Sequence, residues 1–482
     1  MARTVCFYDD RELLPRQGLA LVPGPVEKLG EVTLDGAVAG ERRVCFAGAV
    51  VPWQGGWRLY YSDHGSFPHS KFRLAVAASE DGLHWRKVKT SSPDGFIHPA
   101  GLPAEESLVQ PQAVILPGGR VRIYFWWHGH QINRARYIAA ESDNGVDFTI
   151  VNLDDPCLFH PSDFNVGQAG FAAGLTAPVV NEARESERTV PWLEAKRRRS
   201  NDATFVYYNE RLRLFEMYSV WLVPNDPASG RYVPHDNAPQ IVRVMHRRTS
   251  EDGLLWSDPY LILTPDECDP LDLQFYHLAV QELGEWRLGM LGHYRCWAQT
   301  MDLELCFSRD GRHWERPLRG GFVPRGEAHD TDYYYAYPTS RMIPDGDDWL
   351  MLYDGGNYKH NGELPEGVTE RRTGILAARV PQGRFAGLQA TEAVGSLELK
   401  CIPSVQAITV NGAVRGRLRA ELRDVFGRPL DGYHLDDSVD ITGDSAAHVL
   451  RWGDGRTSEA YRYDAVRLRL EITEGTLYNI LL

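Results

Sequence analysis

The chain has 482 residues, of which 43% are hydrophobic and 24% are charged, and its formal net charge is −13 at pH 7. A chain of this length can bury more than one core, and its negative charge argues against a nucleic-acid partner. No apolar run approaches the length of a membrane helix, so we expect no membrane association.

The N-terminal stretch and the cysteines bear on location and cofactors. Residues 1–10 contain no hydrophobic signal core, so a cytoplasmic location is expected. The seven cysteines show no paired metal-ligand spacing, which favours buried thiols. We therefore expect no metal site and no cofactor, and the sequence leaves the oligomeric state open.

One short phrase occurs four times and predicts the fold. It combines a serine, an Asp-Gly or Asn-Gly pair and an aromatic residue, and its copies are Ser79–Trp85, Ser142–Phe148, Ser250–Trp256 and Ser308–Trp314. The Asp or Asn accepts backbone bonds across a tight turn, the Gly supplies a positive φ, and the aromatic residue fills the junction between neighbouring sheets. Repetition of such a turn is typical of a radial β-architecture.

β-rich runs surround these turns. The run before each copy reads as a third strand, and these runs are Phe72–Ala78, Ala135–Ala140, Ile241–Arg247 and Leu303–Phe307. A second set ends in aromatic or large apolar residues: Trp57–Tyr61, Arg120–Phe125, Arg213–Tyr218, Trp286–Leu291 and Trp349–Tyr353. The second set has five members, so the sequence predicts a five-bladed β-propeller over residues 1–392.

The region of about 160–200 interrupts this pattern. It is Gly-rich and then highly charged, ending in Lys196–Arg199, which no blade strand would tolerate. We interpret it as an insertion between the second and third blades. A solvated loop is one reading, and a lid or oligomer contact over the channel mouth is the other.

The last part of the chain, residues 393–482, has a different pattern. Gly412–Asp424 and Ala465–Ile472 alternate apolar and charged residues between Gly and Pro turns. One buried and one solvated face suit an antiparallel β-sandwich. The expected fold class is therefore all-β, a five-bladed propeller followed by a C-terminal sandwich.

The chain resembles the five-bladed propeller glycoside hydrolases with a C-terminal β-sandwich, a group that includes invertases, levanases, arabinanases and β-xylosidases. Besides the blade pattern, the resemblance rests on Phe7–Arg11, Tyr353–His360 and Leu422–Tyr433. The Asn-Asp-Pro-Asn-Gly and Arg-Asp-Pro runs of invertases are missing, so the match is to the wider group. It implies a carboxylate-based site in the central channel.

Glycosidic cleavage needs a carboxylic acid that protonates the leaving oxygen and a carboxylate that acts as nucleophile or base. Acids at the start of innermost strands can reach the channel of a propeller. Asp202 and Asp332 each precede an aromatic-rich strand, and the resemblance implies an Asp at similar points. Asp269, at the start of the fourth innermost strand, is the third catalytic candidate.

Further candidates for substrate contact are acids, aromatics and histidines near strand ends, a mixture that suits sugar rings and their hydroxyls. They are Glu41, Asp63, His64, Glu106, Trp127, His128, Asp272, His277, Tyr335, Asp354 and His360. Capping and core roles are the competing interpretation for each.

Two functions remain open from the sequence. The first is a glycoside hydrolase, exo-acting on a terminal or short sugar because a propeller funnel is closed at one end. The second is a non-hydrolytic propeller that binds carbohydrate or catalyses another reaction on a glycosylated or natural-product substrate. Two carboxyl groups from different blades facing one pocket would favour the first.

Overall fold

We analysed the protein as a computed structural model, which describes residues 3–35, 44–64, 72–102, 106–129, 134–160, 163, 194, 197–225, 241–338, 340–403, 407–461 and 464–482. These form two compact units, one of residues 1–27, 315–318 and 380–482 and the other of residues 28–314 and 319–379. We call them the terminal unit and the propeller unit. The predicted border between residues 392 and 393 falls inside the terminal unit.

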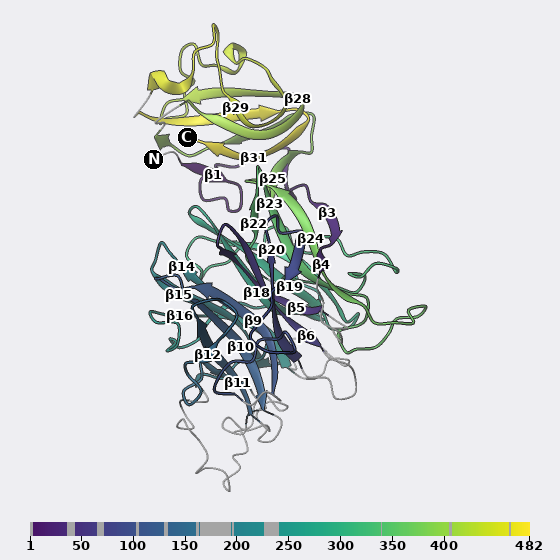
Figure 1. Ribbon diagram of the computed structural model, residues 1–482. Helices are drawn as coiled ribbons and strands as arrows, with labels where there is room; N and C mark the ends of the chain where they lie inside the picture. The colour runs from purple at the N-terminus through teal and green to yellow at the C-terminus, as the bar shows by residue number, and fades with distance from the viewer. Residues whose placement is uncertain are drawn as a thin grey trace. The chain divides into compact units, whose positions relative to one another are not determined.

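The propeller unit is built from mainly antiparallel sheets that follow one another along the chain (Figure 1). The first sheet contains β4 (Thr33–Asp35), β5 (Val44–Trp53), β6 (Gly56–His64), β7 (Phe72–Ser79) and β8 (His84–Lys87). The second contains β9 (Ser107–Ile115), β10 (Val121–Gly129), β11 (Arg134–Ser142), β12 (Thr149–Ile150) and β13 (Leu158–Phe159). The third contains β14 (Thr204–Asn209), β15 (Leu214–Pro224), β16 (Ile241–Ser250) and β17 (Tyr260–Leu263). In the described chain, both predicted sets of strand runs are therefore confirmed for these three sheets.

The fourth sheet joins two groups of strands. The first group is β18 (Leu273–Leu283), β19 (Trp286–Arg295) and β20 (Thr300–Ser308). The second is β21 (Tyr335–Pro338), β22 (Ile343–Asp345), β23 (Asp348–Gly356), β24 (Thr373–Pro381) and β3 (Glu27–Glu31). They meet through one parallel pair, Met301 with Tyr335. The all-β propeller prediction is confirmed, and the count of five blades stays a prediction.

The repeated turns have the predicted chemistry. In each copy the serine hydroxyl accepts the Gly N–H, as Ser250 does from Gly253 at 2.8 Å. Asp252 accepts the next two backbone N–H groups at 2.8 Å and 2.9 Å, and Gly253 has a φ of 73°. These bonds satisfy donors that a reversing chain would otherwise leave unpaired.

The turns also connect neighbouring sheets. A tyrosine of the preceding sheet meets the aromatic residue of the turn edge-on in three places: Tyr60 with Phe148 at 6.0 Å, Tyr124 with Trp256 at 6.4 Å and Tyr218 with Trp314 at 5.8 Å between ring centroids. This edge-to-face geometry is favourable for aromatic pairs. The predicted placement of the aromatic residue between sheets is confirmed.

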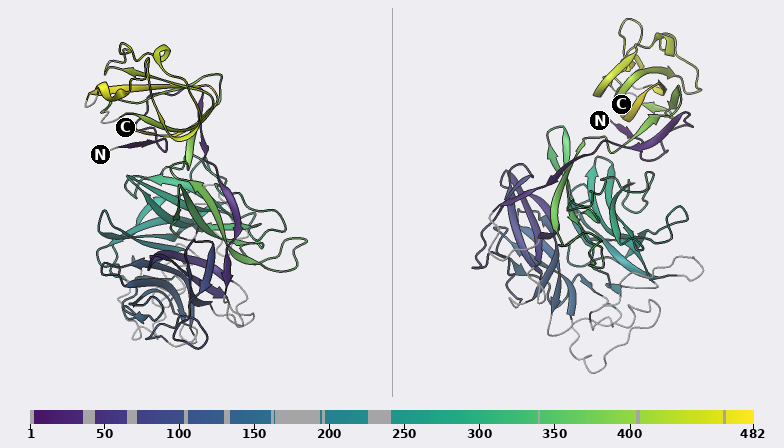
Figure 2. Two further views of the ribbon diagram at one scale, coloured as in Figure 1. Left: turned by 45° about the horizontal axis from the view of Figure 1, so that its top comes forward. Right: turned by 90° about the vertical axis from the view of Figure 1, so that its right-hand side faces the viewer.

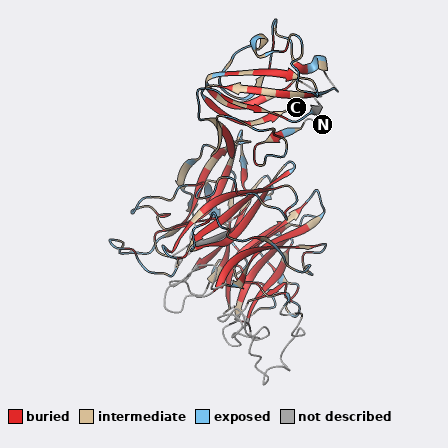
Figure 3. Cartoon of the chain, turned by 180° about the vertical axis from the view of Figure 1, so that it is seen from behind, coloured by how far each residue is buried: buried red, intermediate tan, exposed pale blue. Residues whose placement is uncertain are grey.

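The turn of the first sheet packs differently. Its Trp85 joins a buried cluster that includes Ile343 and Leu350 of the last strand group, so the first and last groups of the propeller unit are in contact. Figure 3 shows that the strands are buried along most of their length. The repeated phrase thus specifies the contacts between neighbouring sheets as well as the turns.

The terminal unit is one hydrogen-bonded sheet whose strands curl around a single core (Figure 2). Its strands are β1 (Thr4–Cys6), β2 (Leu19–Pro23), β25 (Ala386–Ala390), β26 (Gly395–Glu398), β27 (Ile402–Pro403), β28 (Thr409–Arg423), β29 (Ile441–Val449), β30 (Ala465–Ile472) and β31 (Gly475–Leu481). The long β28 pairs with β31 in its first half and β30 in its second, which lets the sheet fold over. Two 3-10 helices, Leu435–Asp437 and Ser458–Tyr461, complete the unit.

No disulfide joins the six cysteines with described side chains. Cys157, Cys296 and Cys306 are buried as predicted, but Cys268 and Cys401 are exposed because they lie in loops. Among the described residues, no helix is long and apolar enough to cross a membrane, and no three His, Cys, Asp or Glu side chains gather as a metal site would need.

Candidate functional site

Asp202 lies at the start of the innermost strand β14, where the sequence predicts a catalytic acid. Its carboxylate accepts a bond from the Tyr276 hydroxyl, which lies 2.9 Å from Oδ1 and 2.8 Å from Oδ2. The side chain of Asn201 donates to Oδ1 at 2.9 Å. Because Tyr276 belongs to β18, the carboxylate is oriented by side chains from two neighbouring sheets.

Burial, and secondly the negative charge of Asp202, raise the pKa of Tyr276 well above its ordinary value. The phenol therefore keeps its proton and remains a donor to the carboxylate. The guanidinium of Arg243, 5.0 Å from the Tyr276 ring centroid, supplies a positive charge that opposes this shift.

His277 follows Tyr276 and is strained. Its φ is 84°, in the left-handed region that favours glycine, and the strand bulges between Phe275 and Leu278. Burial lowers its pKa to about 4, with partial opposition from Asp202, so the imidazole is neutral at pH 7. Its Nδ1 is buried and has no hydrogen-bond partner in the described chain. Strain and an unpaired buried nitrogen are features that cluster at functional sites.

His160, from the segment after β13, extends this network. Its Nε2 lies 3.0 Å from Asn201 Oδ1, and the amide nitrogen of Asn201 is already donating to Asp202. Asn201 Oδ1 is thus an acceptor, which requires a proton on His160 Nε2. Burial lowers the His160 pKa, so this ring is also neutral at pH 7.

Aromatic rings from the fourth sheet and from the loop after β23 surround Tyr276. The ring centroids of Tyr337 and His360 lie 5.9 Å and 5.3 Å from that of Tyr276, and Tyr294 lies 6.0 Å away. We call Asp202, Asn201, His160, Arg243, His277 and these aromatic residues the Asp202 cluster. It combines one carboxylate, imidazoles and phenols, a mixture that suits sugar hydroxyls and apolar ring faces.

A second carboxyl group lies next to the cluster. Asp354 of β23 is the cross-strand partner of Tyr337, so the two side chains share one face of the sheet. Asp354 is 5% exposed. The sequence placed Asp354 among the substrate contacts, and the sheet register puts it beside the ring that contacts Tyr276.

Other predicted residues also lie near the cluster. The His128 ring is 6.1 Å from that of His160, and Tyr335 is 5.2 Å from Tyr337. His64 ends β6, but its side chain lies outside the described residues, as do Glu41 and most of residues 160–200.

Asp332 and Asp269 are engaged elsewhere. Asp332 is 1% exposed and pairs with Lys28 at 2.7 Å, and Tyr353 donates to it at 3.0 Å. Lys28 belongs to β3, the last strand in the order of the fourth sheet. Asp269 pairs with Arg319 at 2.9 Å and accepts the Asp266 N–H at 2.9 Å.

Three further predicted contacts have structural partners as well. Asp272 pairs with Arg295 at 2.7 Å. Asp63 is buried and pairs with Arg73 at 2.5 Å. Glu106 accepts the indole N–H of Trp127 at 3.1 Å. None of these contacts involves a member of the Asp202 cluster.

Sequence reasoning missed Tyr276, Asn201, His160 and Arg243. Asn201 and Tyr276 adjoin candidates that it named, Asp202 and His277, so their proximity was available as a signal. Arg243 lies inside a strand run and carries no local sign of its role.

Comparison with known proteins finds similarity in backbone structure but none in sequence. No family model matches the sequence, and no curated protein matches it. One similar solved structure is a glycoside hydrolase, 12% identical over 74% of this chain and 92% of its own, with a TM-score of 0.49.

Two others carry more specific titles. One is an N-acetylgalactosamine deacetylase from F. plautii in complex with blood group B trisaccharide, 16% identical over 77% of this chain and 97% of its own, with a TM-score of 0.46. The other comes from work on the GH130 family of mannoside phosphorylases, 13% identical over 76% of this chain and 96% of its own, with a TM-score of 0.44. Identities this low bring no activity to this chain, and its propeller assignment rests on its own strand order and repeated joints.

Proposed function

We propose that this protein is a glycoside hydrolase that removes a terminal sugar at the Asp202 cluster. The observation that carries the proposal is the Asp202 carboxylate, held by Tyr276 and Asn201 at the start of an innermost strand. In this proposal Asp202 is the nucleophile or the base that activates water. The stereochemical outcome follows from the separation of the two carboxyl groups once substrate is bound.

The second carboxyl group in this proposal is Asp354. It shares a sheet face with Tyr337, whose ring is 5.9 Å from that of Tyr276. Asp354 would protonate the leaving oxygen, while His277 and His360 would bind sugar hydroxyls. Asp332 and Asp269 were the other catalytic candidates from the sequence, and their ion pairs with Lys28 and Arg319 support Asp354 instead.

The test is hydrolysis of a panel of 4-nitrophenyl furanosides and pyranosides by the full-length protein. We expect release of nitrophenol from at least one member, and its loss by at least about 1,000-fold in Asp202→Asn. Asp354→Asn should lose less on these substrates, because nitrophenolate leaves with little help from a general acid. Asp332→Asn and Asp269→Asn should lower stability and leave kcat of the folded fraction within a few-fold. Activity that survives Asp202→Asn would overturn the proposal.

One observation favours a second function. As defined above, the cluster contains one carboxylate, that of Asp202, and two of its histidines, His160 and His277, are neutral at pH 7. A site with one carboxylate can bind sugars without cleaving them. If wild type cleaves no member of the panel but binds a monosaccharide in a way that Asp202→Asn abolishes, carbohydrate binding replaces hydrolysis.

A further inference from the structure

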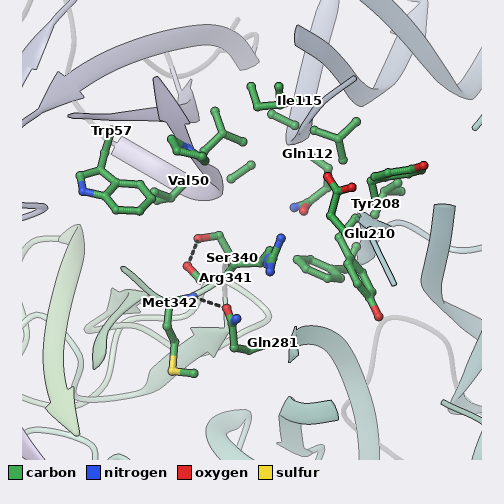
Figure 4. Close-up of a pocket in the computed structure, with 18 of the residues that line it drawn as sticks. Val50, Trp57, Gln112, Ile115, Tyr208, Glu210, Gln281, Ser340, Arg341 and Met342 are labelled. Carbon is green, nitrogen blue, oxygen red and sulfur yellow. Dashed lines mark hydrogen bonds between the residues drawn. The ribbon is translucent and has the colours of Figure 1, made fainter. Parts of the chain in front are cut away.

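A separate cavity of about 310 Å³ lies in the propeller unit at the other ends of the innermost strands. Segments of β5, β9, β14 and β18 line it together with residues 340–344. We call it the distal cavity, and Figure 4 shows its labelled residues. Its volume is at the lower end of the range for small-molecule sites.

The distal cavity is distinct from the Asp202 cluster. Asp202 precedes β14, whereas the cavity is lined by later residues of that strand and by Glu210 beyond its end. On β18, His277 belongs to the cluster and Gln281 to the cavity, about 13 Å further along an extended strand. Phe205 lies between them, with its ring centroid 6.5 Å from that of His277 and its side chain on the cavity wall.

The cavity contains a buried acceptor without a partner. Gln112 is 1% exposed, and its Nε2 donates to the Gly48 carbonyl at 2.6 Å. Its Oε1 has no hydrogen-bond partner among the described residues. An unpaired buried carbonyl oxygen destabilises a protein, so a donor from outside the chain, either a water molecule or a ligand group, would be favourable at this position.

Two charges of opposite sign face the same space. In the described chain, the side chains of Arg341 and Glu210 form no hydrogen bond or ion pair, although both line the cavity. Figure 4 shows the polar ends of Gln112, Glu210 and Arg341 on the side away from Trp57. Glu282 adds a second negative charge near Arg341, so the set does not favour an anion.

The opposite side of the cavity is apolar. Trp57 and Met342 line it, with Val50 beside them. An indole face packs against the C–H face of a sugar ring, while hydroxyl groups can both donate to Gln112 and Glu210 and accept from Arg341. A ligand with hydroxyls around an apolar face satisfies every one of these groups at once.

We propose that the distal cavity binds one neutral sugar ring, as a site additional to the Asp202 cluster. The hydroxyl groups of the ring pair with Gln112, Glu210 and Arg341, and its apolar face rests against Trp57. This goes beyond the proposed hydrolase function, because it involves none of the residues of the Asp202 cluster.

The experiment is isothermal titration calorimetry of the full-length Asp202→Asn protein. This variant is used because the substitution disables the Asp202 cluster. The probes are D-glucose, D-galactose and D-mannose, with sodium acetate and glycine as an anion and a zwitterion. We expect one hexose to bind, and both Arg341→Gln and Glu210→Gln to weaken it at least tenfold. The controls Arg86→Gln and Glu80→Gln change exposed residues outside the cavity and should bind as the parent does.

Each outcome bears on the proposal. Absence of hexose binding overturns it, and so does hexose binding that neither cavity variant weakens. Binding of acetate or glycine that depends on Arg341 would make the cavity an ion or zwitterion site instead. Hydrolysis by wild type and by Asp202→Asn is measured separately. If the hydrolase proposal fails, the titrations of the cavity variants therefore still test hexose binding in the distal cavity.

Discussion

The hydroxyl of Tyr276 is within hydrogen-bond distance of both oxygens of Asp202, at 2.9 Å and 2.8 Å. Tyr276→Phe removes this donor and keeps the ring. Because a hydrogen bond to a charged group contributes about 1.5–3 kcal/mol, kcat/KM should fall roughly 10- to 150-fold. Tyr260→Phe, at an exposed tyrosine, is the matched control. Unchanged kinetics in Tyr276→Phe would show that the bond does not act on the reacting carboxylate.

His277 should reveal its backbone strain when it is replaced. At a φ of 84°, glycine relieves a strain that alanine retains. We expect His277→Gly to be more stable than His277→Ala by about 1 kcal/mol in urea unfolding, the reverse of the usual order in a strand. The usual order would show that the bulge relaxes when the imidazole is removed.

We expect the protonation of His277 to lower the free energy of unfolding in mild acid. Burial lowers its pKa from 6.5 to about 4, so the unfolded chain binds a proton in this range before the folded one does. Its contribution is present above pH 6.5 and is lost as the pH falls toward 4, by about 2 kcal/mol at pH 5. Urea unfolding at pH 7 and pH 5 measures this. His277→Gln should show a smaller loss, whereas the exposed control His313→Gln should match wild type.

Glu216 holds a buried ion-pair network. It accepts bonds from Arg287 at 2.7 Å and Arg247 at 3.1 Å, which outweigh the effect of burial and lower its pKa to about 2. Glu216→Gln leaves two buried arginines uncompensated and should cost about 3–5 kcal/mol. The Glu216 contribution is present above pH 4.5 and is lost as the pH falls toward 2.

The control is Glu285→Gln, since Glu285 pairs with Arg309 at an exposed position. This change should alter the free energy of unfolding by less than about 1 kcal/mol. Equal effects of the two substitutions in thermal or urea unfolding would contradict the role assigned to Glu216.

Alanine substitutions at two glycines distinguish the cost of steric crowding from the cost of backbone strain. Gly253 and Gly284 have φ values of 73° and 61°, so alanine is strained at both. A Cβ at Gly253 would lie 2.5 Å from the Tyr124 hydroxyl oxygen, whereas nothing lies within 4 Å at Gly284. Gly253→Ala should therefore be more destabilising by at least about 1 kcal/mol. Equal melting temperatures would mean that the joint between the second and third sheets adjusts freely.

Local chemistry explains what the sequence predicts well. The turns around Gly253 and its counterparts are encoded in four to seven adjacent residues. Their repetition was enough to predict the strand runs between them and the radial fold. The position of Asp202 before an innermost strand is likewise visible in the local sequence, and its catalytic role stays a prediction. These features need no knowledge of distant partners.

The remaining catalytic candidates depend on such partners. Asp332 and Asp202 look alike in sequence, yet Asp332 pairs with Lys28, which is about 300 residues away in the chain. Asp269 is held by Arg319 from another loop. Side-chain direction and long-range ion pairs decide which acid reaches a site. Neither can be inferred from the residues that flank the acid in the sequence.

The contact between the first and last strand groups of the propeller unit has a consequence for stability at low temperature. It joins strand groups that are far apart in sequence, and it is formed by a buried apolar cluster that contains Trp85, Ile343 and Leu350. Apolar association weakens as temperature falls. Hydrogen exchange at low temperature should therefore rise first on either side of this contact, where the circle of sheets would begin to come apart.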